Sequence, residues 1–540
     1  MTSHNKNLSL TSTFLILFVM LFMNASIHAQ DTIRATTDYS SEYMVSQFQL
    51  GVTYTHKDIN PYAQSRAMQY LDSAPVKLHN AHIMGWGVGN PNPEPGVYNW
   101  SGLDNRIARI QNLKNSEVVI TFCTAPGWMK TSGEDWNMND RVADEHFDDF
   151  AELCRKIAAR YPEVKYFQVW NEFKGFWNSS LGKWDAPKYT EMYNAVYNAV
   201  RAERPDALIG GFYKGYSRVL AEGGYFSQED HDLIDYWLEN KAGADFICFD
   251  GSIHGWPHEA APEEHLMQIS SCFGKVAKQI GEKTDLPIWV SEYYGANMVG
   301  DAQFQTANHA SCYYHSLING TAVGLHWEPF AFTPLFDNPN AYDGGQPTEH
   351  YNVVKIYNRH FGPGRQLYKT TCSDSSRLEM LASATKTLFI NKRDTSVQVD
   401  YNENRITLNP YEVKLHEKTF DDIELLKGDT SSLRELIKPV DLARDSVNIY
   451  TSNQEIVAAN DSGLITGKGN GHARVTFKIH EAGFTDSLSI GVDVKSYTPV
   501  TFRVDISGIE KPPWFHTMYF ADKSITCWQF VAMSHDPNDE

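Results

Sequence analysis

The stretch "YFQVWNEF", residues 166 to 173, passes directly from aromatic and β-branched residues to an amide and a carboxylate. A run of this kind is typical of a buried β-strand. Asn171 and Glu172 therefore stand where a buried strand ends, and a polar pair at that position needs a reason. A closed barrel of parallel strands supplies one, because the carboxyl ends of its strands form the active site.

The sequence around this stretch has the pattern of such a barrel. From about residue 48 to 360, short apolar segments alternate with amphipathic segments such as "HFDDFAELCRKIAARY", which is typical of repeated strand-helix units. We predict eight strands, at residues 48–56, 74–86, 117–128, 166–172, 207–213, 245–256, 286–294 and 322–330. Eight units in roughly 280 residues match an α/β fold of the (β/α)8 type, the TIM barrel. A doubly wound open sheet is the competing fold, but "GVTYTH" stands where it would carry a glycine-rich phosphate loop.

The rest of the chain predicts further domains. We assign residues 36–363 to the barrel and, from short alternating strands such as "RLEMLAS" and "KTLFINKRD", residues 364–425 to a β-sandwich. Residues 430–496 have turn residues at close intervals and glycines at tight corners, which predicts another all-β domain. Its segment "SNQEIVAANDSGLITGKGNGHARVTF" resembles a bacterial immunoglobulin-like domain of group 2. Residues 497–540 remain unassigned.

The N-terminus predicts export. Lys6 precedes the apolar run "FLILFVMLFM", and small and polar residues follow up to Ala29, so residues 1–29 have the pattern of a cleaved signal peptide. The run is too short to span a bilayer comfortably, and no later stretch approaches about 20 apolar residues, so we expect no transmembrane segment in the mature chain. No cysteine lies near the cleavage point, which disfavours a lipid anchor. The predicted location is periplasmic or secreted.

Composition narrows the set of partners. The 47 basic and 66 acidic residues give a net charge of −19 with no long basic run, which disfavours nucleic acid. Aromatic residues make up 13% of the chain and include 13 tryptophans, a composition compatible with stacking against sugar rings. The seven cysteines are spread singly, and no His, Asp or Glu cluster has metal-ligand spacing, so we predict no metal site. A G-x-S-x-G elbow for serine-hydrolase chemistry is also lacking. The oligomeric state is left open.

Two carboxylates carry the functional prediction. Glu172 ends the fourth predicted strand and Glu292, in "IWVSEYYG", lies near the end of the seventh, and these strands face each other across a barrel. Glycoside hydrolysis needs two such carboxyl groups, about 5 to 5.5 Å apart in retaining enzymes and about 6.5 to 9.5 Å apart in inverting ones. For either glutamate alone, a salt bridge at a strand end is the simpler interpretation. The two together favour catalysis.

The same residues resemble a known group of enzymes. "WNE" at the end of the fourth strand and "SE" in the seventh resemble clan A of the glycoside hydrolases, which are retaining (β/α)8 enzymes. Within it, "PVKLHNAHIMGW", "YNWSGLDNRIARI" and "LFINKRD … LNPYEVKLHE" resemble family 39, which includes β-xylosidases and α-L-iduronidases. The resemblance implies that Glu172 is the acid/base, Glu292 the nucleophile, Asn171 the amide that binds the sugar 2-hydroxyl, and Trp327 an aromatic floor under the ring. This chain departs from the clan at Lys77, where an arginine is usual, and at Trp256, where a tyrosine usually supports the nucleophile.

Elementary electrostatics assigns the same roles. Glu172 must be protonated to donate, and burial beside Trp170, Phe173 and an anionic Glu292 should raise its pKa, whereas Glu292 must be ionised. Strand-end histidines are candidate hydrogen-bond donors to Glu292 or to sugar hydroxyls. The predicted substrate-binding residues are Asn171, His79, Lys77, Trp128, His254, Trp256, Tyr294 and Trp327. Glu328 is expected to point away from its neighbour Trp327 and to be structural or substrate-orienting.

The leading hypothesis is therefore a secreted retaining glycoside hydrolase that acts on a plant or algal glycan, as a xylosidase-like or related exo-glycosidase. Its partner would be an oligo- or polysaccharide, and no cofactor is expected because the carboxylates do the covalent work. An endo-acting hydrolase of an agar-like or sulfated algal polysaccharide is the alternative within the class. A barrel that only binds carbohydrate is the alternative from another class.

Overall fold

A computed structural model describes residues 32–54, 60–253, 262–295, 300–330, 333–440, 446–481 and 484–496, together with 519–520 and 531–532. The predicted signal peptide, at residues 1–29, lies outside these ranges. Among the described helices, none is long and apolar enough to cross a membrane.

Eight strands close into a barrel in the order β10-β11-β2-β3-β4-β5-β8-β9, and all the neighbouring strands are parallel. They are β2 (Gln49–Tyr54), β3 (Leu78–His82), β4 (Glu117–Phe122), β5 (Tyr166–Val169), β8 (Leu208–Gly215), β9 (Phe246–Ser252), β10 (Ile288–Tyr294) and β11 (Thr321–Trp327). Every predicted barrel strand is present, so the predicted (β/α)8 barrel is confirmed. The predicted ranges for β3, β4 and β11 extend past the observed strand ends, because the apolar pattern continues into the loops.

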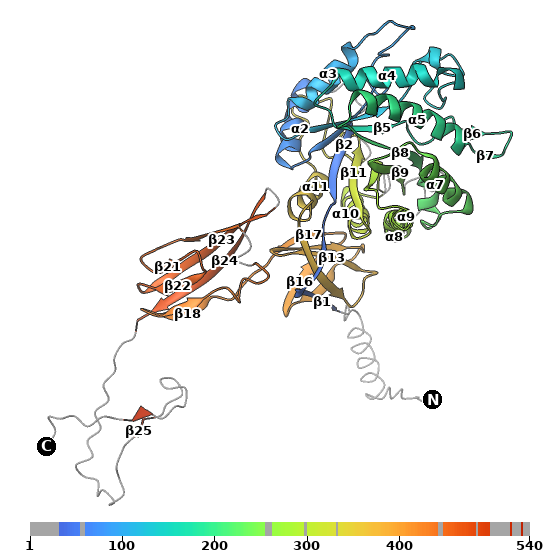
Figure 1. The fold of residues 1–540 in the computed structure, drawn as a ribbon. Coiled ribbons are helices and arrows are strands. Elements are labelled where there is room, and N and C mark those ends of the chain that lie inside the picture. The colour runs from blue at the N-terminus through green and yellow to red at the C-terminus, as the bar shows by residue number, and fades with distance from the viewer. Residues whose placement is uncertain are drawn as a thin grey trace, which may run out of the picture.

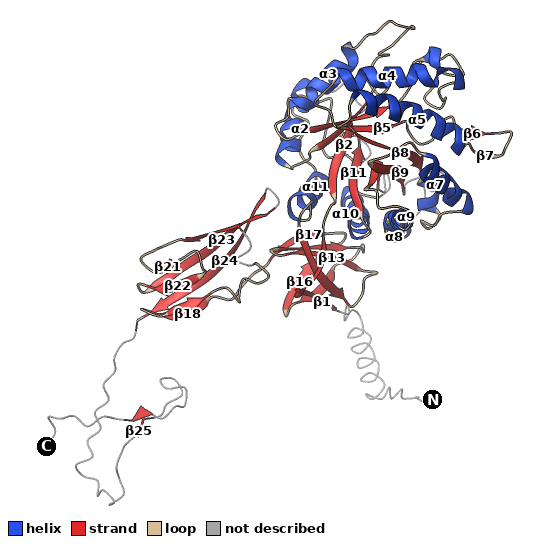
Figure 2. Cartoon of the chain, in the orientation of Figure 1, coloured by secondary structure: helices blue, strands red, loops and turns tan. Residues whose placement is uncertain are grey.

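Helices surround the barrel, as Figures 1 and 2 show. They are α2 (Pro61–Ser73), α3 (Ser101–Gln111), α4 (Phe147–Arg160), α5 (Ala186–Glu203), α6 (Ser217–Ala221), α7 (Gln228–Asn240), α8 (Glu263–Ile269), α9 (Cys272–Gly281), α10 (Ala302–Ile318) and α11 (Glu349–His360). Several begin at side-chain caps: Asp301 accepts from the backbone N–H of Phe304, and Ser227 forms a capping box with Asp230. These two caps fix the residues at which α7 and α10 begin.

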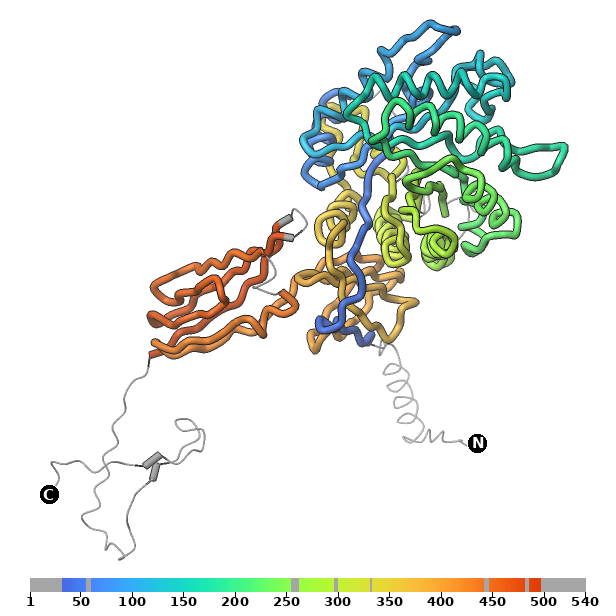
Figure 3. The backbone as a smooth tube through the Cα atoms, viewed as in Figure 1, coloured from blue at the N-terminus to red at the C-terminus, as the bar shows by residue number. Residues whose placement is uncertain are grey.

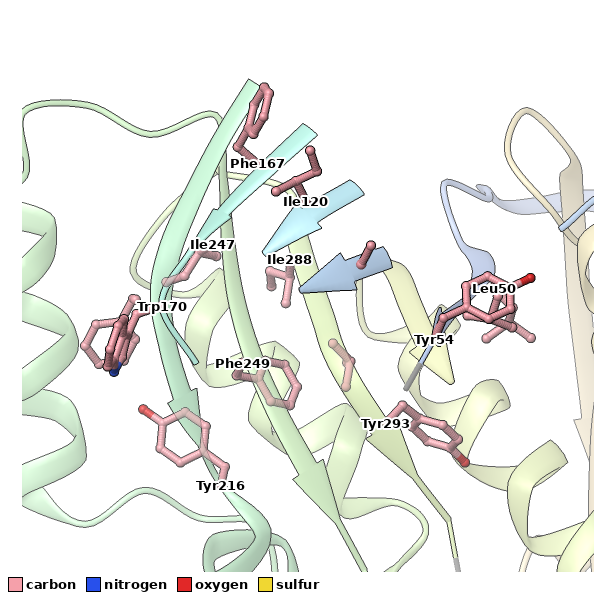
Figure 4. Close-up of a cluster of buried hydrophobic side chains, with 14 of the residues drawn as sticks. Leu50, Tyr54, Ile120, Phe167, Trp170, Tyr216, Ile247, Phe249, Ile288 and Tyr293 are labelled. Atoms are coloured by element: carbon pink, nitrogen blue, oxygen red, sulfur yellow. The ribbon is translucent and has the colours of Figure 1, made fainter. Parts of the chain in front are cut away.

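Apolar side chains fill the layer between strands and helices. Ile120 on β4, Phe167 on β5 and Ile247 on β9 are fully buried there, and Figure 4 shows these three side chains. Inside the barrel the packing becomes polar below the carboxyl ends: Thr121 donates to Asn80, and Gln168 donates to Thr121. A side-chain hydrogen bond from Ser291 on β10 to Gln168 on β5 joins strands that are not neighbours, so it crosses the interior. The interior side chains between this polar layer and the carboxyl ends of the strands therefore face one another across the barrel.

The first described strand belongs to a second sheet. β1 (Ile33–Val45) pairs antiparallel with β12 (Gln366–Cys372) and parallel with β15 (Val397–Tyr401), in the order β16-β15-β1-β12-β13-β14-β17. Figure 3 shows this N-terminal segment lying along the chain that follows the barrel. The predicted barrel boundary at residue 36 therefore needs correction. The alternation of buried Ile33 and Ala35 with exposed neighbours is a strand pattern that the sequence analysis did not use.

The second sheet is buried on two faces. The remaining strands are β13 (Leu378–Ser383), β14 (Lys386–Asn391), β16 (Asn404–Leu408) and β17 (Val413–Glu417). Leu388 and Ile390 join the core that includes the barrel helices, whereas Phe389 packs with Val399 in a separate core. Glu379 on β13 ties the sheet to α10: its carboxylate lies 2.8 Å from His315 of that helix and 2.6 Å from Lys392.

A further all-β unit follows. The order β18-β24-β23-β20 forms one sheet and β19-β22-β21 another, and side chains of both, including Ile465, Val475 and Ile490, share one buried core. The strands are β18 (Ile423–Leu426), β19 (Thr430–Ser432), β20 (Ser446–Thr451), β21 (Val457–Ala459), β22 (Leu464–Gly467), β23 (Gly471–Glu481) and β24 (Phe484–Lys495). The structure thus has further sheets after the barrel, and the immunoglobulin-like identity of this unit stays a prediction. β25 (Tyr519–Phe520) pairs with β26 (Val531–Ala532) in the segment that was left unassigned.

Candidate active site

Three carboxyl groups meet at the carboxyl end of the barrel. Glu172 follows β5, Asp250 lies on β9 and Glu292 on β10, and one oxygen from each lies within 4.8 Å of the others. Asp250 and Glu292 are buried, whereas the side chain of Glu172 keeps 26% of its surface exposed. The structure thus brings together the two glutamates that the sequence singled out and adds an aspartate to them.

A bulge aims Glu292 at this cluster. Val290 pairs with Phe249 and Glu292 pairs with Asp250, so Ser291 is one extra residue on β10. A β-bulge of this kind re-aims the side chains next to it. Ser291 already reaches into the barrel interior, and strict alternation would turn the following residue outward. The extra residue allows both to face inward.

A strained turn places Glu172. Trp170, Glu172 and Phe173 have positive φ angles of 69°, 54° and 58°. Residues other than glycine rarely adopt this conformation, and each one costs about 1 to 3 kcal/mol unless its surroundings hold it. Here Trp170 is fully buried, and its indole N–H donates to the carbonyl of Lys174 at 2.9 Å, closing the turn. The turn holds the Glu172 carboxyl beside the other two acids.

Lys174 and Asn171 connect the two glutamates. The Lys174 ammonium forms an ion pair with Glu172 and donates to Oδ1 of Asn171 at 3.0 Å. Asn171 in turn donates from Nδ2 to Oε2 of Glu292 at 3.4 Å, and the hydroxyl of Tyr294 donates to Oε1 of Glu292 at 2.9 Å. Both oxygens of Glu292 therefore have donors, and Asn171 and Tyr294 lie where substrate-binding residues were predicted.

The pKa directions are the reverse of those expected from the sequence. Burial, together with the negative charge of Glu172, raises the pKa of Glu292 to about 8, although Lys174 and Tyr294 act against it. Burial also acts to raise the pKa of Glu172, but the adjacent Lys174 ammonium, together with Asp250 and the charge of Lys214, outweighs it and holds that pKa below its ordinary value. In the ligand-free protein the proton of this pair lies on Glu292. The expectation from the sequence did not include Lys174, which is the largest of the causes that lower the pKa of Glu172.

Aromatic rings adjoin the carboxylates. The ring of Trp327 lies 6.0 Å from that of Tyr294 and 5.8 Å from each of His82 and Trp86. His82 and Trp86 are themselves 4.1 Å apart, and Lys174 lies 5.8 Å from the centre of the Trp86 ring. Rings grouped in this way offer faces against which a sugar can stack. Trp327 thus lies near the ring of Tyr294, whose hydroxyl donates to Glu292.

His79 and Lys77 do not reach this site. His79 is buried with Nδ1 at 3.1 Å from the Tyr54 hydroxyl and Nε2 at 2.8 Å from the carbonyl of Val76, in the layer between strand and helices. Because side chains alternate along a strand, His82 faces the interior and His79 faces outward. Lys77 is exposed and precedes β3, at the opposite end of the barrel. The prediction that these two residues bind substrate is corrected.

The remaining predicted residues lie in loops. Trp128 is in the turn η1 (Gly127–Met129), and its indole N–H donates to the carbonyl of Asn92 at 2.9 Å, which anchors one loop to another. His254 and Trp256 lie outside the described residues, so their roles stay predictions. Glu328 accepts at 3.3 Å from the N–H of Phe330 and is not one of the three clustered acids.

Sequence reasoning missed three charged residues. Asp250 closes the apolar run "FICFD", which is the same signal that drew attention to Glu172. Lys174 follows Glu172 by two positions. Lys214 on β8 is buried with its ammonium 4.1 Å from the centre of the Trp184 ring and 3.1 Å from the carbonyl of Gly215. A search for polar residues at all eight strand ends would have found Asp250 and Lys214.

Within the part of the barrel that the structure describes, two buried groups could offer metal ligands, and neither fits an ion. His309, His326 and His350 bring ring nitrogens within 4.8 Å, but both nitrogens of His350 are engaged at 2.9 Å, by Tyr313 and by the carbonyl of Thr333. Two free imidazoles are fewer than the three protein ligands of a catalytic zinc. The three carboxyl groups already have the Lys174 ammonium as their counter-ion.

Comparison with known proteins finds likeness only at the level of structure. No family model matches the chain, and no curated protein matches it either. A monomeric β-xylosidase from Caulobacter crescentus CB15 is 16% identical over 66% of this chain and 76% of its own, with a TM-score of 0.46. The catalytic domain of the GH30 xylanase C from Talaromyces cellulolyticus is 11% identical over 83% and 99%, with a TM-score of 0.48. The GH39 enzyme from Xanthomonas axonopodis pv. citri is 15% identical over 72% and 78%, with a TM-score of 0.47. At these values the likeness carries no argument about chemistry, so function is derived from the site.

Proposed function

We propose that this protein is a glycoside hydrolase that cleaves its substrate by double displacement, with Glu292 as nucleophile and Glu172 as acid/base. The observation that carries the proposal is the approach of their carboxylate oxygens to within 4.8 Å. Retaining enzymes hold the two carboxyl groups about 5 to 5.5 Å apart, whereas inverting ones need about 6.5 to 9.5 Å to admit water between base and sugar. The short separation favours retention.

In the first step, the Glu292 carboxylate attacks the anomeric carbon while the glycosidic C–O bond breaks. The leaving oxygen takes the proton of Glu172, and a glycosyl ester of Glu292 forms. Asn171 and Tyr294 hold the Glu292 carboxylate in place by their hydrogen bonds to its two oxygens. The reactive form therefore has Glu172 protonated and Glu292 ionised, which is the reverse of the preference that the two pKa shifts give.

In the second step, Glu172 is the base. The ester removes the negative charge of Glu292, which lowers the pKa of Glu172 further. Glu172 takes a proton from water as the water oxygen attacks the anomeric carbon, and the ester bond breaks to release the Glu292 carboxylate. Lys174 stabilises the ionised form of Glu172 at this stage.

The substrate class we propose is a plant or algal glycan, cleaved in the exo manner of the xylosidases that the sequence resembles. The rings of Trp327 and Trp86 supply apolar faces for a sugar ring, and Asn171 supplies the amide for its 2-hydroxyl. An endo-acting hydrolase remains the alternative, because exo and endo action differ in the shape of the loops around such a site.

A panel of xylan, glucan, galactan and algal polysaccharides, together with aryl glycosides, tests the proposal by sizing the products. Release of single sugars supports exo action, and a ladder of oligosaccharides supports endo action. The Glu292→Gln variant should have no turnover, and Glu328→Gln serves as the control for a change of charge at the same end of the barrel. Glycan binding without hydrolysis of any bound ligand would replace the proposal with a carbohydrate-binding barrel.

A further inference from the structure

Asp250 occupies a place that the two-carboxylate mechanism does not explain. It is 2% exposed, and it pairs in register with Gly215 of β8. A Cβ atom added to Gly215 would lie 3.1 Å from Oδ1 of Asp250 and 3.4 Å from Oε1 of Glu172. The two carboxyl groups thus lie together over a residue that has no side chain, and a larger residue at 215 would crowd both.

The hydrogen bonds of Asp250 are incomplete. Neither of its oxygens has a hydrogen-bond partner among the residues that the structure describes. A buried ionised carboxylate without donors is strongly unfavourable. The neighbouring group is the carboxylate of Glu172, which as an anion can only accept. A hydrogen bond between the two forms only if one of them carries a proton.

The charges around Asp250 and Glu172 determine which of the two carboxyl groups carries the proton. Among the described residues, four charged groups face Asp250: Glu172 and Lys174 after β5, Lys214 on β8 and Glu292 on β10. The Lys174 ammonium forms its ion pair with Glu172, so Glu172 is the better site for the negative charge. Burial, with the charges of Glu172 and Glu292, holds the pKa of Asp250 well above its usual range. The proton therefore lies on Asp250.

We propose that Asp250 is a positioning residue that holds a proton against Glu172 in the ligand-free protein and passes it to Glu172 when a glycoside binds. This inference rests on the proposed function. In the transfer, the O–H bond of Asp250 breaks, its proton joins Glu172, and Asp250 becomes a carboxylate near Lys174 and Lys214, while Glu292 loses its own proton to solvent and becomes the attacking carboxylate. Glu172 then donates the proton to the leaving oxygen. In the second step Glu172 takes a proton from water and returns it to Asp250.

The consequence is measurable through the leaving group. The Asp250→Asn variant keeps the size of the side chain and can still donate an N–H to Glu172, but it has no proton to transfer. For a glycoside with a poor leaving group, kcat/KM should fall by about 10²-fold, because general-acid assistance is worth about 10² to 10⁴. For a dinitrophenyl glycoside, which needs no acid, the loss should stay within about threefold. The basic limb of the pH profile should move to lower pH with the poor leaving group.

Two controls separate this role from a structural one. Glu328→Gln, a buried carboxylate outside the cluster, should affect both leaving groups alike. An equal loss with both leaving groups in Asp250→Asn, or an unchanged pH profile, would overturn the inference. Infrared difference spectra of wild type and Asp250→Asn at neutral pH give a second readout without turnover. The wild type should show one protonated-carboxyl carbonyl band more than Asp250→Asn, which keeps the band of Glu292, and absence of this additional band also overturns the inference.

The two proposals fail in different ways. If the wild type hydrolyses no glycoside, the proposed function is what fails. If the wild type is active and Asp250→Asn matches it with both leaving groups, only the role of Asp250 fails.

Discussion

Replacing Lys174 with methionine removes the charge that keeps Glu172 ionised. The ammonium of Lys174 forms an ion pair with Glu172 and donates to Asn171 at 3.0 Å, whereas its contact with Glu292 runs through that asparagine. A positive charge this close lowers a carboxyl pKa by about 1 to 3 units, and the partial exposure of Glu172 places the effect at about 1 to 2 units. That corresponds to roughly 1.4 to 2.7 kcal/mol of stabilisation of the ionised form.

The pH dependence of kcat/KM on an aryl glycoside measures this effect. The lower of the two apparent pKa values belongs mainly to Glu172, so the acidic limb of the profile should move to higher pH by about 1 to 2 units in Lys174→Met. Lys174→Arg keeps the charge and should leave the limb in place. An acidic limb that stays unchanged in Lys174→Met, or moves to lower pH, would refute the assignment of Lys174 as the group that sets the ionisation of Glu172.

Three further changes follow from individual contacts. Glu379 is buried beside His315 and Lys392, which hold its pKa at about 2 against the effect of burial. Its carboxylate therefore stabilises the fold above the unfolded pKa of about 4.3, and this stabilisation disappears as the pH falls toward 2. Glu379→Gln should therefore lower the unfolding free energy by about 3 kcal/mol at neutral pH and weaken its acid dependence, as chemical denaturation would show; equal stability at neutral pH would contradict this. Tyr294→Phe removes the hydroxyl that donates to Glu292 at 2.9 Å, so the pKa of Glu292 should rise and kcat should fall by about tenfold or more. The circular dichroism spectrum should stay unchanged. Full activity of this variant would show that Tyr294 has no role in the site. Trp177 lies on the hairpin of β6 (Trp177–Asn178) and β7 (Lys183–Trp184), where it is 49% exposed and contacts Trp184. If its exposed surface stacks on a sugar, Trp177→Ala should raise KM for a polysaccharide several-fold and leave KM for an aryl monoglycoside unchanged. Equal polysaccharide KM values for the wild type and the variant would exclude this contact.

The barrel was predictable because its strands are local patterns. Each buried strand is a short apolar run between turns, and eight runs alternating with helices leave few folds to choose from. β1 was missed for the opposite reason. Its partner strands, β12 and β15, begin at Gln366 and Val397, more than three hundred residues later. A local sequence pattern can indicate a strand, but it does not indicate which distant strand it will pair with.

The site was predictable only in part. Polar residues at the ends of buried strands identified Glu172 and Glu292. Which histidine of β3 faces the barrel interior depends on the alternation of side chains along the strand. His79 and His82 are three positions apart, so they face opposite sides, and a strand end placed too late obscured which one points inward.

The direction of the two pKa shifts required the structure. Sequence spacing indicates neither that the Lys174 side chain folds back onto Glu172 nor that Asp250 approaches it. Both facts arise from a turn with positive φ angles after β5 and from the register between β8 and β9.

The identity of the residue that becomes bonded to the sugar is the most direct test of this account. In the ligand-free protein Glu172 is ionised and Glu292 carries the proton, so electrostatics alone would allow the two roles to be exchanged. A dinitrophenyl 2-deoxy-2-fluoroglycoside should trap the intermediate, and mass spectrometry of the digested protein should locate the label. The account predicts a label on Glu292. A label on Glu172, or no covalent adduct in a protein that turns over the parent glycoside, would contradict it.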